Sequence, residues 1–199
     1  MPRALARILP CIAALVVATT AGPARGAERE PAVDERFRGL YVGAGSSVTS
    51  IAGSAGVLVG PELGVVAGDY VFGVAGYGLA SAVEPASLQA SGAAAHVHLG
   101  YGVAEMGTIL FKDEIVHVIP ALTFGAGGVN AIRRESSSGE AIWVLEPKLE
   151  LELALPSLRA VRFGARGSYR FVSAFELDGL TAAGLSGPAA GAFVKVGFF

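Results

Sequence analysis

The sequence predicts an all-β fold, an eight-stranded antiparallel up-and-down transmembrane β-barrel. Three observations predict it. Apolar and polar residues alternate with period two over most of residues 38–199, which gives each strand one apolar and one polar face. The connections between these segments are alternately short and long, as in barrels whose turns and loops lie on opposite sides of a membrane. After the N-terminus there is no apolar run near 18 residues, which excludes a helical membrane protein.

The N-terminus has the features of an export signal. Arg3 and Arg7 precede an apolar run from Ile8 to Ala21, which is too short for a membrane-spanning helix. Small residues follow, and Ala24-Arg25-Gly26 is the best cleavage site. We therefore expect a cleavable signal peptide at residues 1–26, a flexible N-terminal segment at 27–37 and one barrel domain at 38–199.

Cleavage changes the charge and the cysteine content of the chain. The 15 basic residues lose Arg3, Arg7 and Arg25, which leaves 12 basic against 17 acidic side chains and a formal net charge of −5. That sign disfavours nucleic acid as a partner. Cys11 follows Pro10 inside the apolar run, so it does not fit a lipid-attachment site and is removed with the signal. Glycine, at 28 of 199 residues, has about twice its ordinary frequency of roughly 7%.

Eight segments follow a strand pattern in order along the chain. We expect strands near 38–50, 54–66, 70–83, 92–111, 115–133, 141–155, 160–174 and 187–199.

The connections divide into two groups. Tight ones lie at residues 67–69, 112–114 and 156–159, and longer ones at 84–91, 134–140 and 176–186. Eight strands place both termini at the end with the tight turns, which faces the periplasm in outer-membrane barrels and leaves the longer loops outside.

The sixth and seventh strands show which face is which. Trp143, Leu149 and Leu151 share one parity with other apolar residues, whereas the opposite parity is charged. We expect lipid on the apolar face and a lumen charge network on the other. The expected members of this network are Glu62, Glu146, Lys148, Glu150, Glu152, Arg162, Arg166, Arg170 and Lys195. Opposite charges should interleave, because an unpaired charge in a low-dielectric interior is costly.

An eight-stranded barrel has an interior about wide enough for its own side chains. We therefore interpret the network as a salt-bridged plug, with an ion or proton path as the alternative. No nucleophile elbow, phosphate-binding loop or dinucleotide-binding motif is present, so we expect no catalytic residues and no cofactor.

His96 and His98 are two residues apart and face one way, which we expect to be inward, while His117 lies near a tight turn. Two such histidines can bind zinc, but neither a cysteine nor a clear third ligand accompanies them. Hydrogen bonding in the lumen is the preferred interpretation, and no metal is expected.

Some residues do not fit a regular pattern. Glu105 shares the apolar parity of Val97, Leu99, Tyr101 and Val103, which predicts a bulge near residues 104–107 or a position near the membrane interface. Three prolines lie inside expected strands, where each removes a ladder donor and favours a bulge or a strand end: Pro61, Pro120 and Pro147.

Four short motifs carry a resemblance over most of residues 38–199. They are Gly76-Tyr77-Gly78-Leu79, Val144-Leu145-Glu146-Pro147, Gly167-Ser168-Tyr169-Arg170-Phe171-Val172-Ser173 and Leu185-Ser186-Gly187-Pro188 before the aromatic C-terminus. With them the chain resembles a family of small, largely uncharacterised bacterial outer-membrane β-barrel proteins. The resemblance implies an outer-membrane location and assigns no catalytic residues.

We therefore expect a non-enzymatic, monomeric barrel in the bacterial outer membrane with a structural or surface-interaction role. Its expected partners are outer-membrane lipid and the barrel-assembly machinery, which would recognise the C-terminal aromatic strand. In that strand the apolar alternation is more regular counted back from Phe198 than from Phe199. The alternatives are a narrow channel or small-ligand carrier, a lipid-modifying enzyme using His96 or His98 with Glu105, and a soluble periplasmic barrel with its apolar face inward.

Overall fold

The structure is a computed structural model, and it describes residues 37–81, 83, 96–132, 137–177 and 180–199. The predicted signal peptide and nearly all of the predicted N-terminal segment lie outside these residues. Within the described parts of the chain, no helix is long and apolar enough to cross a membrane.

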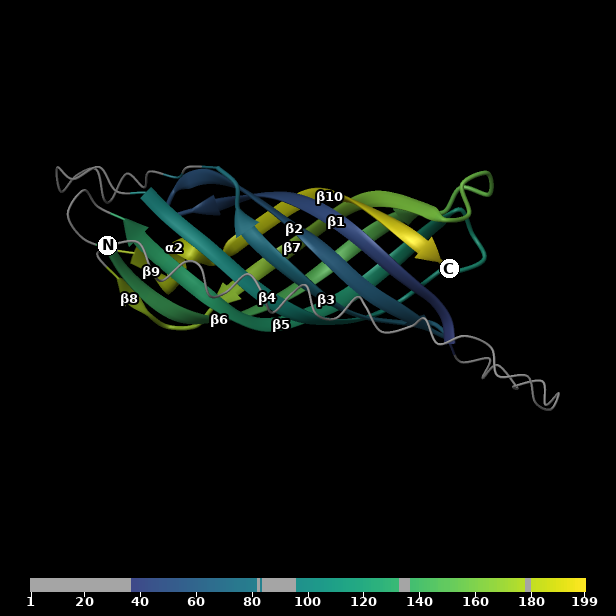
Figure 1. Cartoon of the computed structure of the whole chain (residues 1–199), viewed down its shortest axis with the longest axis horizontal. Coiled ribbons are helices and arrows are strands. Elements are labelled where there is room, and N and C mark those ends of the chain that lie inside the picture. Colours follow the sequence, from purple (N-terminus) through teal and green to yellow (C-terminus); the bar gives the residue numbers. More distant parts are fainter. Residues whose placement is uncertain (1–36, 82, 84–95, 133–136, 178–179) are drawn as a thin grey trace, which may run out of the picture. The chain divides into compact units, whose positions relative to one another are not determined.

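Eight long strands close into an antiparallel barrel, as Figure 1 shows. In chain order they are β1 (Phe37–Ile51), β2 (Ser54–Ala67), β3 (Tyr70–Leu79), β4 (His96–Thr108), β5 (Val116–Ile132), β6 (Ser137–Leu153), β7 (Val161–Val172) and β10 (Gly187–Phe198). Each pairs with its neighbour in sequence, and β10 closes the barrel against β1. The predicted fold class is confirmed.

The boundaries differ from the expected ones at a few places. The third strand ends at Leu79 instead of continuing to residue 83, although Val83 forms an isolated bridge with Val97. The sixth strand begins at Ser137, so residues 137–140 belong to a strand and not to a long loop. The expected start of the fourth strand at residue 92 lies outside the described residues.

The predicted bulge around Glu105 is wrong. Its strand keeps one register on both sides, with Glu105 opposite Gly73 on β3 and Thr123 on β5. The strand prolines cause no register shift either. Pro61 lies where two successive residue pairs are missing between β2 and β3, and Pro147 lies where two are missing between β6 and β7. In both places the same register resumes beyond the gap. A missing donor thus interrupts the hydrogen bonding without displacing the strand.

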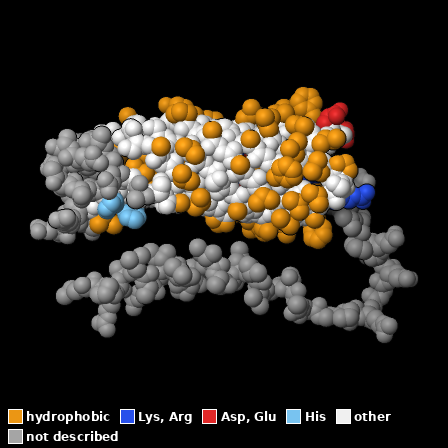
Figure 2. Space-filling model, turned by 90° about the horizontal axis from the view of Figure 1, so that it is seen from above, with side chains coloured by type: hydrophobic (Ala, Val, Ile, Leu, Met, Phe, Trp, Pro, Cys, Tyr) orange, Lys and Arg blue, Asp and Glu red, His pale blue; other side chains and the backbone are white. Residues whose placement is uncertain are grey.

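The apolar face of the strands points away from the barrel axis. Trp143, Leu149 and Leu151 are 59%, 47% and 47% exposed, whereas Glu150 and Glu152 between them are buried. Figure 2 shows hydrophobic side chains spread over the visible outer face, with Lys, Arg, Asp and Glu only near one end. This orientation is opposite to the soluble alternative, in which the apolar face would lie inward.

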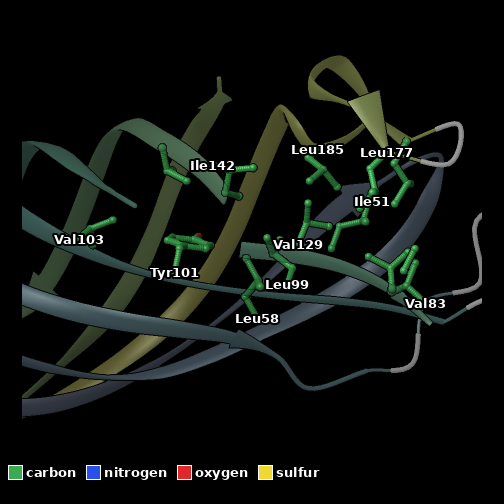
Figure 3. Close-up of a cluster of buried hydrophobic side chains, with 14 of the residues drawn as sticks. Ile51, Leu58, Val83, Leu99, Tyr101, Val103, Val129, Ile142, Leu177 and Leu185 are labelled. Atoms are coloured by element: carbon green, nitrogen blue, oxygen red, sulfur yellow. The ribbon is translucent and has the colours of Figure 1, made fainter. Parts of the chain in front are cut away.

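The end of the barrel opposite the C-terminus, here called the loop end, is filled with apolar side chains. The connection after β7 contains β8 (Glu176–Leu177), β9 (Leu180–Thr181) and α2 (Ala182–Leu185), and it was expected to be a plain loop. Its three leucines, Leu177, Leu180 and Leu185, join a buried cluster with residues of the barrel wall such as Ile51, Leu99 and Ile142 (Figure 3). We call this group the loop-end cluster.

The short-turn end, which carries the C-terminus (Figure 1), has a smaller apolar group. Tyr41, Val66, Val71, Ile109 and Ile119 form this turn-end cluster, with Phe199 packed against it. Apolar groups therefore occupy the interior at both ends. The charged residues lie between them, because on β6 they follow Ile142 and Val144 towards the short-turn end.

Candidate functional site: the charge network inside the barrel

Period-two alternation brings ten charged side chains into the middle of the barrel. β6 supplies the most, since every second position from residue 146 to residue 152 carries a charge. We use the name charge network for the carboxylates Glu62, Glu105, Glu146, Glu150 and Glu152 and the cations Lys148, Arg162, Arg166, Arg170 and Lys195.

Two lysines bind the centre of the network together. The Lys148 Nζ donates to Glu105 at 2.5 Å and to Glu150 at 2.9 Å. The Lys195 Nζ donates to Glu150 at 2.7 Å and to Glu152 at 3.2 Å. Three strands, β4, β6 and β10, are thus joined by ion pairs whose signs alternate. Such interleaving compensates part of the cost of taking each charge out of water.

Arg166 connects the network to the opposite wall. Its Nη1 lies 2.5 Å from the Glu62 Oε1 on β2 and donates to the Tyr77 hydroxyl at 2.8 Å. The Tyr77 hydroxyl in turn donates to Glu62 at 3.1 Å. The Arg166 Nε lies 3.8 Å from Glu150, so Arg166 also faces the central carboxylate.

At the short-turn end the network finishes with Arg162 and His117. Arg162 donates to the Glu152 Oε1 at 2.7 Å. The His117 Nδ1 lies 3.2 Å from that same oxygen and 3.2 Å from the Arg162 Nη1. One ring nitrogen therefore faces a donor and an acceptor at equal distance, and its protonation decides which of the two it bonds.

At the other end of the network the guanidinium of Arg170 has neutral partners. It donates to the Leu185 carbonyl at 3.0 Å, to the Thr49 hydroxyl at 3.0 Å and to the Tyr101 hydroxyl at 3.4 Å. Glu146 accepts hydrogen bonds from Ser168 and Tyr101. Within the part of the chain that the structure describes, neither Arg170 nor Glu146 has an opposite charge at ion-pair distance, and Tyr101 links the two.

Little space remains among these side chains. The cavity between Tyr77, Tyr101, Glu146, Lys148 and Arg166 has a volume of about 10 Å³. One water molecule requires about 10 to 15 Å³. This cavity therefore has room for about one water and for no larger solute.

The structure brings all nine sequence-predicted network residues to the interior, although Arg170 and Glu146 lack the ionic partners expected for them. Sequence reasoning missed Glu105, the tyrosines Tyr77 and Tyr101, and the role of His117. Glu105 shares the parity of the apolar residues Val97 to Val103, and on a membrane barrel such a parity is expected to face outward. They are buried, because the interior of this end of the barrel is apolar.

The expected inward orientation of His96 and His98 is wrong. Both are exposed on the outer face of β4. Val97, which lies between them, and Leu99, which follows His98, point inward. Glu105 lies on the inner face of the same strand, so the His and Glu of the enzyme alternative point to opposite sides of the barrel wall. The described residues contain no group of three or more His, Cys, Asp or Glu arranged to hold a metal ion.

Comparison with known proteins supports the fold. No protein-family model matches the chain, and no curated protein matches its sequence. Neisserial surface protein A aligns with 79% of this chain and 95% of its own, with a TM-score of 0.60 and 14% identity. The N-terminal barrel domain of Pseudomonas aeruginosa OprF aligns with 81% of this chain and 98% of its own, with a TM-score of 0.58 and 10% identity.

A third structure, the attachment invasion locus protein Ail of Yersinia pestis, aligns with 82% of this chain and 98% of its own, with a TM-score of 0.50 and 13% identity. At these identities the likeness concerns the fold. The chain thus forms a closed eight-stranded antiparallel barrel, and its structural neighbours are barrels of the bacterial outer membrane.

Proposed function

We propose that this protein is a non-enzymatic barrel of the bacterial outer membrane with a structural or surface-interaction role, and that the charge network plugs its lumen. The observation that carries the proposal is the cavity of about 10 Å³ among the buried charges. A barrel filled in this way offers its outer face and its ends to partners, and not its interior.

The outer face supports the membrane location. Apolar side chains point outward from all eight long strands, and aromatic ones lie towards both ends of the apolar zone, as interfacial residues do in membrane barrels. Trp143, Tyr169 and Phe171 lie on one side of it, and Tyr70 and Phe198 on the other. We expect the protein to fractionate with outer membranes and to show heat-modifiable migration in detergent gels. Recovery in the soluble periplasmic fraction would contradict the location.

A narrow channel or small-ligand carrier is the first alternative. Transport of an ion would require a continuous path past Lys148, Arg166 and Lys195, each of which is buried and held by at least one carboxylate. We expect the purified protein to give no stable, reproducible conductance in planar bilayers, with a porin in the same preparation as the positive control. Discrete conductance steps would overturn the plug and favour the channel.

A surface-interaction role receives support from two of the structural neighbours, which are by name a surface protein and an attachment protein. The proposed partners are outer-membrane lipid along the barrel wall and the barrel-assembly machinery at the last strand, and the proposed state is a monomer. Size-exclusion chromatography with light scattering in detergent tests the monomer, and a dimer mass would contradict it.

A further inference from the structure

We propose that Phe199 is the stopper of the lumen at the short-turn end, and that displacing its ring opens a path from solvent to the turn-end cluster and to the buried members of the charge network behind Arg162. The inference rests on the proposed plugged lumen, and it names the side chain that closes one end of it.

The two terminal phenylalanines lie on opposite sides of the barrel wall. Phe198 ends β10 and is 82% exposed on the outside. Phe199 follows it and packs against the turn-end cluster inside. Successive residues of an extended chain point to opposite faces, which accounts for this division.

Residues on both strands that flank β10 hold the Phe199 ring. On β1, the Tyr41 ring stacks on it with a centroid distance of 6.0 Å and an interplanar angle of 18°. On β7, the Arg162 guanidinium carbon lies 3.9 Å from its centroid. The cation and the aromatic ring attract each other at this distance. Phe199 thus occupies a position across the seam where the barrel closes.

The ring lies beside Arg162, whose side chain is 15% exposed, in front of the more deeply buried members of the network. Two cavities of about 330 and 220 Å³ lie at this end, and the residues that line both of them are Arg162 and Phe199. His117 lines the larger cavity, and Glu152 lies directly behind Arg162 at 2.7 Å. Removing the ring joins the two cavities in front of Arg162 and exposes the turn-end cluster beneath it.

The stopper can move without breaking the sheet. The register of β10 with β1 ends at the pair Leu40 and Phe198, and its register with β7 ends at Val196. Phe199 lies beyond both, so its displacement leaves every registered pair in place. The same position makes the ring testable separately from the fold.

A thiol-accessibility experiment tests the proposal. Cys11 is the only cysteine and lies in the predicted signal peptide, so a single thiol introduced into the processed barrel can be followed alone. Val71→Cys places that thiol in the turn-end cluster, where Val71 is 2% exposed. In the detergent-folded barrel, we expect a small cationic methanethiosulfonate to modify the thiol at position 71 slowly. After Phe199→Ala the modification should be at least about tenfold faster, because the turn-end cluster around this thiol then opens locally to solvent.

Phe198→Ala is the matched control, since it removes the same ring from the outer face, and we expect it to leave the modification rate unchanged. Equal acceleration by both variants would mean that the strand end merely frays, and would overturn the stopper. If Phe199→Ala does not fold, Phe199→Leu replaces it and should accelerate the reaction to a smaller extent; no acceleration in a folded variant also overturns the stopper.

The design separates this inference from the proposed function. If Val71→Cys reacts as fast as a thiol at the exposed Asp113 while Phe199 is still present, the plugged lumen itself fails. If Val71→Cys is protected both with and without the Phe199 ring, the lumen is closed by other groups and only the role of Phe199 fails.

Discussion

The Arg170 Nε donates a hydrogen bond of 3.0 Å to the carbonyl oxygen of Leu185, across fifteen residues of sequence. Arg170 belongs to the barrel wall on β7, and Leu185 is the last residue of α2 in the segment that covers the loop end. The buried guanidinium therefore ties the covering segment to the interior of the barrel. The Ala52 amide adds a second tie at 2.6 Å to the Gly184 carbonyl, from the tight turn between β1 and β2.

Replacing Arg170 by Met should loosen this segment without unfolding the barrel. The partners of Arg170 are neutral, so no carboxylate loses an ion pair, and the loss should be about 1 to 3 kcal/mol for acceptors left unsatisfied. Amide hydrogen exchange should accelerate at Ala52 and Ser186, whose amides bond to the segment, and remain slow in the middle of β4. Unchanged exchange at Ala52 would show that the tie is not needed.

Replacing Arg166 by Ala should be more costly. It leaves Glu62 buried with the Tyr77 hydroxyl as its hydrogen-bond donor, and the free energy of unfolding should fall by roughly 3 to 5 kcal/mol, as measured by the unfolding midpoint in detergent. The double variant Glu62→Gln with Arg166→Met removes both charges. Its unfolding midpoint should therefore lie closer to that of the unmodified protein than the midpoint of Arg166→Ala does. An unchanged midpoint in Arg166→Ala would count against the plug.

Glycine at position 45 makes room for the same ion pair. A Cβ there would lie 2.8 Å from both the Arg166 Nη2 and the Glu62 Oε1, so Gly45→Ala should cost about 1 to 3 kcal/mol through displacement of these groups. Gly76 is the matched control, because a Cβ there meets nothing within 4 Å. Gly76→Ala should be neutral or stabilising by up to about 1 kcal/mol. Equal effects of the two substitutions would contradict the steric explanation.

The outward histidines should be dispensable for stability and for lipid chemistry. His98 is exposed on β4, so His98→Ala should change the free energy of unfolding by less than about 0.5 kcal/mol. Mass spectrometry of lipid A should give the same masses with the unmodified protein and with His96→Ala or His98→Ala. A mass change that depends on either histidine would favour the lipid-modifying enzyme instead.

The sequence was informative where one face of a strand carried a single kind of residue. In β6, every inward position from Glu146 to Glu152 is charged and the outward positions are mainly leucine, so both the barrel and its charged interior could be predicted. In β4 the same rule misassigned the faces, because the inward residues Val97 to Val103 are apolar and the outward ones are mainly His, Gly and Ala. Alternation alone therefore shows that two faces exist, but does not identify the inner one.

Long-range contacts were beyond the reach of local pattern. Glu150 meets Lys195 from 45 residues away, and Lys148 meets Glu105 from 43 residues away. These pairings depend on the stagger of strands around the closed barrel, which a period-two pattern does not specify. The covering segment was also missed, because Leu177, Leu180 and Leu185 have neither strand nor helix spacing and gain their burial only against the barrel wall.

The position of Lys195 has a consequence for assembly. Lys195 lies on β10, which pairs with β7 on one side and with β1 on the other, and its ammonium contacts both Glu150 and Glu152 on β6. Before the last strand docks, the neighbouring hairpin of β6 and β7 would hold both carboxylates without that cation, and an open sheet would leave its edges unpaired as well. Pairing of β10 with β7 brings the Lys195 ammonium to both carboxylates, so docking of the last strand completes the charge network in the same step that covers the free edge of β7.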